Sequence, residues 1–226
     1  MKELILNNNQ ISSFKGIPNN AFPNLKELNL NNNQITSFEG LSGETFLNLK
    51  KLYLGGNNIS SFKELSREIF LKLERLILYN NQISSFKELS GKTFPKLEYL
   101  YLDGNQISSF EGLSGKIFPN LERLHLNYNQ IISLKGLSEK IFPKLEKLSL
   151  NNNQIESFKE LSEEFPILKN LDLDNNILKS LVGIGKKFPN LEYLSLLNNN
   201  NLTEGMIKYH KKQLHNIRII FSDYRI

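Results

Sequence analysis

The sequence contains no cysteine and no tryptophan, and only three histidines occur among its 226 residues. Without cysteine the chain has neither a disulfide framework nor a thiol nucleophile, and so few histidines do not favour a tight metal site. No apolar stretch approaches the roughly 18 to 20 residues that a membrane helix needs. The first residues, Met1 to Asn7, are too polar for a secretory signal peptide. These absences argue against a disulfide-stapled domain, a membrane span and thiol chemistry, and they favour a reducing compartment.

Concentrated charge is also lacking over most of the chain, although the net charge is +5. Residues 203–226 carry +3 of that total, and the preceding 202 residues share the remaining +2. A surface that attracts a polyanion needs clustered positive charge. The composition therefore does not favour nucleic acid as a partner.

What the sequence does contain is a pattern that returns every 24 residues. From Leu25 to Ile35 it is Leu-x-x-Leu-x-Leu-x-x-Asn-x-Ile. A fixed period of this length is typical of a stacked solenoid, in which each repeat buries its apolar face against its neighbours. The later copies begin at Leu49, Leu73, Leu97, Leu121 and Leu145, and then at Leu168 and Leu191 after a step of 23, while an earlier copy begins at Met1.

Leucine occupies the fourth and sixth places of every copy, as in Leu28 and Leu30. This alternation is the period of a β-strand with one buried face, so we expect nine to ten short parallel strands. The asparagine at the ninth place is interior and must satisfy its amide by hydrogen bonds. We expect it to form a ladder between adjacent turns. The ladder comprises Asn9, Asn33, Asn57, Asn81, Asn105, Asn129, Asn153 and Asn176.

Fourteen of the fifteen phenylalanines fall in two columns. Rings stacked on successive turns bury a large area and pack against one another, so both columns are interpreted as core spines and not as a cofactor site. The first column is Phe14, Phe38, Phe62, Phe86, Phe110 and Phe158, and the second is Phe22, Phe46, Phe70, Phe94, Phe118, Phe142, Phe165 and Phe188.

A serine column precedes the second phenylalanine column by four residues in the middle repeats. Serine in this position is typical of an N-cap, so it predicts one short helical turn per repeat. Proline follows the phenylalanine in six copies and should end that turn and extend the chain into the next strand. The serines are Ser42, Ser66, Ser90, Ser114, Ser138 and Ser162.

The pattern from Leu25 to Leu41, Leu-x-x-Leu-x-Leu-x-x-Asn-x-Ile-x-x-Phe-x-Gly-Leu, resembles the leucine-rich repeat superfamily. The Ile35-x-x-Phe38-x-Gly40-Leu41 segment is most similar to the class found in intracellular regulatory subunits of a protein phosphatase, and the 24-residue length also resembles toll-like receptor repeats. The resemblance implies an α/β solenoid, a right-handed superhelix with a concave parallel sheet and short helical turns on its convex side. It further implies that the concave sheet binds proteins.

The organisation expected is a solenoid over residues 1–202 and a cap over residues 203–226. Thr203 is placed to begin a helix, and residues 217–222 have the pattern of a tenth, edge strand. The first strand, over residues 3–6, starts without a cap and leaves an open edge. Either the protein extends further, or a partner or a second copy covers that edge, which makes self-association a hypothesis.

Function should lie at the solvent-facing places of the strands, which vary while the core places hardly change. Six of the eight tyrosines fall on this face, and tyrosine and arginine are enriched at protein-binding hot spots. We predict a partner-binding patch in repeats three to six. It consists of Tyr53, Arg75, Ile77, Tyr79, Tyr99, Tyr101, Asp103, Arg123, His125 and Tyr128.

The favoured function is thus a non-catalytic protein-binding scaffold in the cytoplasm or nucleus, with no cofactor and no metal. His125 and Asp103 have no serine nucleophile beside them, and Asp172 with Asp174 would hold a cation only weakly. One alternative is a regulatory subunit of an enzyme such as a phosphatase. The other is anion binding, to nucleic acid or a membrane surface, through a basic cap. That cap would use Lys208, His210, Lys211, Lys212 and His215.

Overall fold

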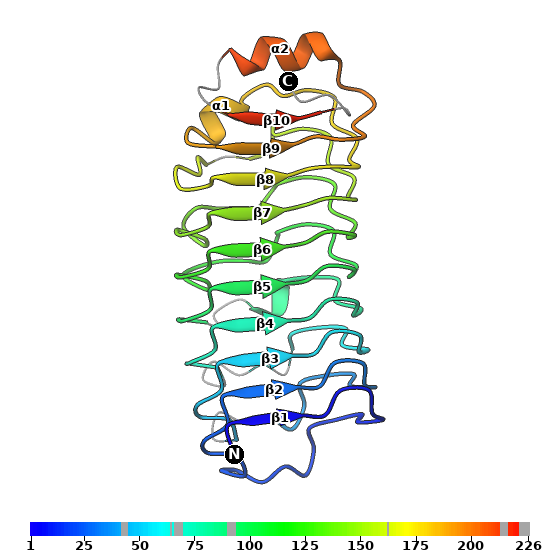
Figure 1. Ribbon diagram of the computed structural model, residues 1–226, viewed down its shortest axis with the longest axis vertical. Helices are drawn as coiled ribbons and strands as arrows, with labels where there is room; N and C mark the ends of the chain where they lie inside the picture. The colour runs from blue at the N-terminus through cyan, green and yellow to red at the C-terminus, as the bar shows by residue number, and fades with distance from the viewer. Residues whose placement is uncertain are drawn as a thin grey trace.

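The computed structural model describes residues 1–41, 45–63, 65, 70–89, 94–161, 163–212 and 217–221. Within them, one parallel sheet contains ten strands, and their order in space is their order in sequence (Figure 1). Each strand has three residues. The strands are β1 Glu3–Ile5, β2 Glu27–Asn29, β3 Lys51–Tyr53, β4 Arg75–Ile77, β5 Tyr99–Tyr101, β6 Arg123–His125, β7 Lys147–Ser149, β8 Asn170–Asp172, β9 Tyr193–Ser195 and β10 Arg218–Ile220.

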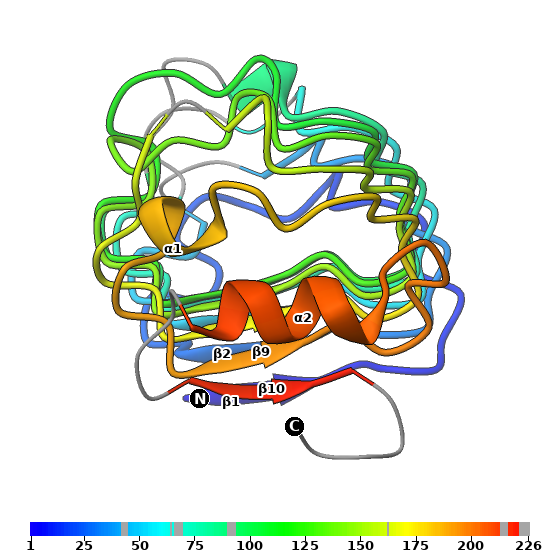
Figure 2. The same cartoon turned by 90° about the horizontal axis from the view of Figure 1, so that it is seen from above.

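The repeat period sets the register of this sheet. Leu28 of β2 pairs with Leu52 of β3, and Leu52 pairs with Leu76 of β4, so identical places of successive repeats lie side by side. These leucines are at most 2% exposed. Seen from above, the blue and red end strands lie further out than the green middle turns on the sheet side (Figure 2). The sheet face is therefore concave, and the solenoid predicted from the leucine pattern is confirmed.

The asparagine ladder is present in the geometry that its chemistry requires. Asn57 Nδ2 donates to the carbonyl oxygens of Leu30 and Leu54, both at 3.0 Å, and its Oδ1 accepts the N–H of Ile35 at 3.0 Å. Each such amide thus satisfies backbone groups of two turns. Asn199, which the sequence analysis left out of the column, makes the same bonds to Leu173, Leu196 and Leu178.

The two phenylalanine spines pack with the leucine and isoleucine columns to form the core. Phe62 lies between Phe38 and Phe86, with both ring centroids 6.3 Å away and the rings nearly parallel. In the second spine, Phe118 stacks on Phe94 and Phe142 at 5.5 Å. The prediction that these columns are core is confirmed, because the rings named are at most 4% exposed.

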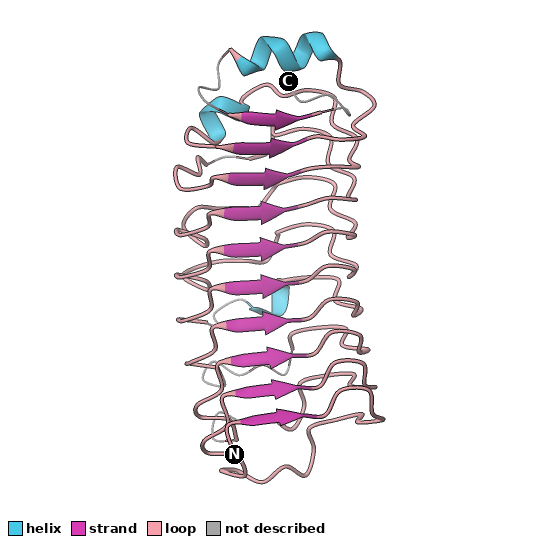
Figure 3. Cartoon of the chain, viewed as in Figure 1, coloured by secondary structure: helices cyan, strands magenta, loops and turns pink. Residues whose placement is uncertain are grey.

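The side opposite the sheet consists mostly of turns (Figure 3). Its described helical segments are the 3-10 helix η1 Lys87–Leu89 and the single-turn α1 Ile184–Lys187. The predicted helical turn forms at Ser138, whose carbonyl accepts the N–H of Phe142 at 3.1 Å. At Ser114 the structure has no helical turn, so the prediction of one in every repeat is wrong there. Ser42, Ser66, Ser90 and Ser162 lie outside the described residues.

The segment that joins each phenylalanine to the next strand is a closed turn, and not the extended connection that the prolines suggested. The N–H of Leu25 donates to the carbonyl oxygen of Phe22 at 3.2 Å. The same bond joins Leu49 to Phe46, where leucine replaces the proline. Proline suits this turn because its fixed φ matches the second turn position, but the turn forms without it.

The two ends of the ladder differ. At the C-terminal end, α2 Glu204–Lys211 lies across the last turn, and Thr203 Oγ1 caps it by accepting the N–H of Met206 at 3.3 Å. Strand β10 pairs with β9, and Ser222, the last residue of the strand predicted here, lies outside the described residues. At the N-terminal end, Leu4, Leu6 and neighbouring apolar residues line a cavity of about 370 Å³. A boundary at residue 202 stays a prediction.

Candidate functional site

The middle of the concave face carries a stack of three side chains from neighbouring strands. Arg75 of β4 and Arg123 of β6 flank Tyr99 of β5 in the sheet register. Their guanidinium carbons lie 4.7 and 5.4 Å from the centre of the Tyr99 ring. Both are cation–π distances, so the ring holds both guanidinium groups in place. Arg123 is exposed, while Arg75 and Tyr99 are half-buried.

Beside this stack lies a second one, made by Tyr101 and His125. Their ring centroids are 4.4 Å apart, and the planes differ by 26°. Burial lowers the pKa of His125 below its usual 6.5, and Lys147 and Arg123 act in the same direction. Asp103 and Asp172 oppose this shift without reversing it. His125 is consequently neutral at pH 7 and serves as an aromatic platform.

Tyr79 is placed on the same face by a glycine. A Cβ on Gly55 would lie 2.4 Å from Cζ of Tyr79, so the tyrosine ring rests where other residues have a side chain. Gly55 and Tyr79 also interrupt a ladder at the seventh place of the repeats. There, Asn31 Oδ1 accepts the N–H of Gly55 at 2.7 Å, and Asp103 Oδ1 accepts the N–H of Asn127 at 2.9 Å. Asp103 is therefore a structural acceptor as well as a patch residue.

The fifth place of the strands is less open than the sequence analysis expected. Ile77, between Tyr53 and Tyr101 in the register, is 8% exposed and is buried, which corrects its assignment as a solvent-facing residue. Further along the same row, Ser149 and Asp172 are buried as well. The Ser149 hydroxyl donates a hydrogen bond to the Asp172 carboxylate at 2.8 Å. Large neighbours and hydrogen bonds thus cover this row, while Tyr53 stays half-buried.

Tyr128 is the most exposed aromatic residue of the predicted patch, at 65%. Its backbone is left-handed, with φ of 55°. The eighth place holds asparagine or glycine in all other copies, which tolerate this conformation. A bulky aromatic residue at this backbone position is uncommon and costs stability, an arrangement that is frequent at functional sites.

The other candidate sites are weaker in the structure. In the basic cap, His210 is buried at 7% exposure and cannot offer a surface, and Lys208 pairs with Glu204 at 3.4 Å. His215 lies outside the described residues. Asp172 accepts from Ser149 and pairs with Lys147 at 3.6 Å, so it is not poised to bind a cation.

The described ranges also lack the groups that a metal site or a membrane span would need. No group of three or more histidine, aspartate or glutamate side chains is arranged to hold a metal ion there. None of the helices in this part of the chain is long and apolar enough to cross a membrane.

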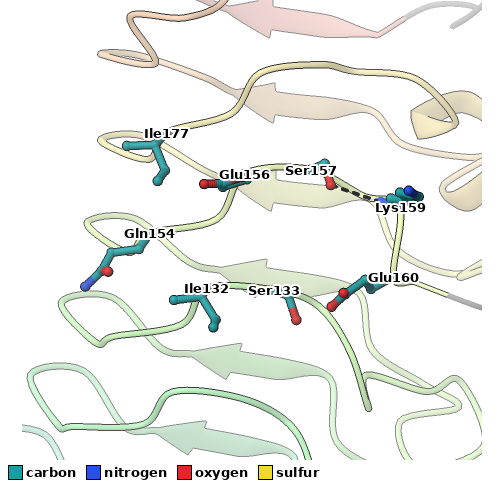
Figure 4. Close-up of a pocket in the computed structure, with 8 residues that line it drawn as sticks. All are labelled: Ile132, Ser133, Gln154, Glu156, Ser157, Lys159, Glu160 and Ile177. Carbon is teal, nitrogen blue, oxygen red and sulfur yellow. Dashed lines mark hydrogen bonds between the residues drawn. The ribbon is translucent and has the colours of Figure 1, made fainter.

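A groove of about 410 Å³ lies away from the sheet face (Figure 4). Ile132 and Ile177 line it from the turns on either side of the one that carries Glu156. Both isoleucines occupy places where most repeats have polar residues, and they are 58% and 42% exposed. Glu156 pairs with Lys179 at 2.9 Å, so the polar rim is partly neutralised.

The family model described as leucine-rich repeats, in two copies, matches residues 1–43, 71–115 and 119–163. Together these segments make up more than half of the chain. The chain belongs to the leucine-rich repeat family. Proteins of this family generally act as interaction scaffolds and are typically non-catalytic, which agrees with the scaffold predicted from the sequence. A search of curated proteins gives no significant match.

Solved structures show the same leucine-rich repeat fold. Internalin C2 from Listeria monocytogenes is 29% identical, with a TM-score of 0.67 over 86% of this chain and 80% of its own. The functional domain of InlJ from the same organism is 16% identical, with a TM-score of 0.67 over 98% of this chain but 44% of its own. TLR13, in a complex with ssRNA13, is 25% identical, with a TM-score of 0.72 over 88% of this chain and 29% of its own.

Proposed function

We propose that this protein is a non-catalytic scaffold that binds a protein partner through the middle of its concave face. The binding surface is the Tyr/Arg patch. It consists of Tyr53, Arg75, Tyr79, Tyr99, Tyr101, Asp103, Arg123, His125 and Tyr128, with Ile77 buried between Tyr53 and Tyr101. The observation that carries the proposal is the contrast between this patch and the rest of the repeat. The core columns hardly vary, whereas five of the six tyrosines of this face gather on β3 to β6 and the turns that follow them.

The arrangement of the patch supports binding more than folding. The two stacks hold aromatic and guanidinium groups in fixed positions, and rigid side chains lose little entropy when a partner binds. Aromatic residues and arginine are the types that dominate interface energies. Tyr128 adds exposed aromatic surface at the cost of an unfavourable backbone conformation.

The test is an affinity capture from host lysate with the intact protein and a Tyr79→Ala/Tyr101→Ala/Arg123→Ala variant. We expect the variant to lose the captured partner, because it removes one member from each stack and the ring above Gly55. Matched substitutions of Ile132 and Ile177 to serine, in the groove on another face, should leave capture unchanged. Equal capture by the triple variant, with circular dichroism showing a folded chain, would sink the proposal.

The identity of the captured partner also bears on the more specific roles of the scaffold. A regulatory subunit of an enzyme such as a phosphatase is one form of the scaffold role, and the identity of the captured protein decides it. Cell fractionation tests the cytoplasmic or nuclear location, and the solution mass at rising concentration tests self-association through β1. Anion binding by the cap is the weaker alternative, since His210 is buried and Lys208 is paired.

A further inference from the structure

The positive charges on the concave face are not all equal. The third places of β3 to β7 hold four cationic residues around Tyr99. The outer two are neutralised, because Lys51 lies 3.0 Å from Glu27 and Lys147 lies 3.6 Å from Asp172. Hydrogen bonding to Glu27 raises the pKa of Lys51 accordingly. Within the described part of the chain, Arg75 and Arg123 form no ion pair with a carboxylate.

Among the third places of β3 to β7, the unpaired positive charge is therefore confined to the two arginines on either side of the Tyr99 ring. Their strands are separated by β5, so at about 4.8 Å per strand their backbones are roughly 10 Å apart. An extended peptide advances about 3.3 Å per residue, so a run of three or four residues spans this distance. Arginine binds carboxylates through paired hydrogen bonds, which a fixed guanidinium makes at a lower entropic cost.

Carboxylates border this positive charge on two sides. One row comes from the residues just before the strands, Glu74, Glu98 and Glu122, which line a polar cavity of about 380 Å³ together with Lys96 and Lys144. Glu74 is paired with Lys50, so Glu98 and Glu122 carry the negative charge of this row. At the other end of β5, Asp103 follows the strand. A nucleic acid backbone carries charge along its whole length and would approach these carboxylates, whereas a short acidic segment meets only the arginines.

We infer that the Tyr/Arg patch recognises a short acidic peptide segment of its protein partner, with carboxylates bound by Arg75 and Arg123. The inference rests on the proposed function, because it names the chemistry of the partner at the same site. Tyr99 holds the two guanidinium groups apart, and Tyr101 with Tyr79 offers apolar surface to residues that flank the acidic run.

The experiment selects peptides from a library of random dodecapeptides displayed on phage, using four forms of the intact chain. These are the unsubstituted protein, Arg75→Gln/Arg123→Gln, Tyr79→Ala/Tyr101→Ala, and Arg218→Gln as a matched control. Arg218 occupies the third place of β10 with its guanidinium 5.9 Å from the ring centre of Tyr193, so it repeats the chemistry at the far end of the same face. Circular dichroism confirms that each form is folded.

We expect the unsubstituted protein and Arg218→Gln to enrich peptides with two or more Asp or Glu within four residues. Arg75→Gln/Arg123→Gln should lose this enrichment. A selected peptide should bind at least tenfold more weakly when its acids are replaced by their amides. Equal acidic content with and without the two arginines overturns the inference. The inference is also overturned if a 20-nucleotide single-stranded RNA binds more tightly than the selected peptide and Arg75→Gln/Arg123→Gln abolishes that RNA binding.

The tyrosine variant separates the two proposals. If Tyr79→Ala/Tyr101→Ala loses the selected peptides but Arg75→Gln/Arg123→Gln keeps them, the patch binds its partner and the acidic preference is wrong. If neither variant changes the selection, the patch is not the binding site, and both proposals fail together.

Discussion

At the scale of single residues, Tyr128 links backbone energetics to function. It occupies a left-handed position that eight other copies give to asparagine or glycine. We expect Tyr128→Asn to raise the free energy of unfolding by about 1 kcal/mol, because the short polar side chain of asparagine hydrogen-bonds to the local backbone and so tolerates the left-handed conformation better than tyrosine does. The same change should weaken capture of the partner. Urea unfolding and the capture assay measure the two effects.

The opposite signs make this variant informative. A residue retained for packing would lose stability on replacement and leave binding unchanged. Asn152→Ala is a suitable comparison, since it alters the same backbone position one repeat later, where φ is 57°, and lies outside the patch. It should lower stability without affecting capture.

At the scale of structural elements, the asparagine ladder is where each turn is joined to the next. Asn105→Ala removes the amide that bonds Leu78 and Leu102 at 2.9 and 3.0 Å and that accepts the N–H of Ile83 at 3.0 Å. We expect a loss of about 3 kcal/mol in the free energy of unfolding, since buried backbone groups are left unpaired.

Asn9→Ala is the control for this prediction. Asn9 belongs to the same column, but among the described residues its amide bonds only Leu6 and Asn7 of its own repeat, and it is exposed. Its replacement should cost well under 1 kcal/mol. Similar losses for Asn9 and Asn105 would show that the column stabilises each turn separately and does not join neighbouring turns.

The elements also show how far sequence reasoning reaches. The Leu-x-Leu alternation, the interior asparagines and the phenylalanine columns define which places are buried, and these predictions are confirmed. Ile77 was predicted to face solvent, but the large side chains of Tyr53 and Tyr101 on the adjacent strands cover it. The alternation within one repeat indicates which way a side chain points, and does not indicate how large its neighbours on other strands are. The helical turn at Ser114 failed because a good N-cap does not itself specify a helix.

At the scale of the whole molecule, acid stability should depend on one patch residue. Burial holds the pKa of His125 in the folded chain below 6.5, so the unfolded chain binds its proton first as the pH falls. The stability that neutral His125 contributes to the fold is therefore lost progressively as the pH falls below about 6.5. Glu111 and Glu163, whose pKa values are lowered from 4.5 by hydrogen bonds to Lys135 and Ser138, add their losses only at more acidic pH.

Urea unfolding at pH 7.5 and pH 5.5 measures this dependence. The unsubstituted chain should be less stable at the lower pH, and His125→Gln should show a smaller difference. An identical difference in the two proteins would assign the acid sensitivity to another group.

The order of the strands has a mechanical consequence. Every strand of the sheet pairs only with those before and after it in the sequence, so within the described residues no strand is bonded to a distant repeat. Tension applied to the two ends of the molecule would peel off one turn at a time and leave the rest folded. Each middle turn holds 24 residues, as the pairing of Leu28 with Leu52 shows, and would release about 80 Å of chain. Such a protein would lengthen under load in a series of similar steps, one for each middle turn that unfolds.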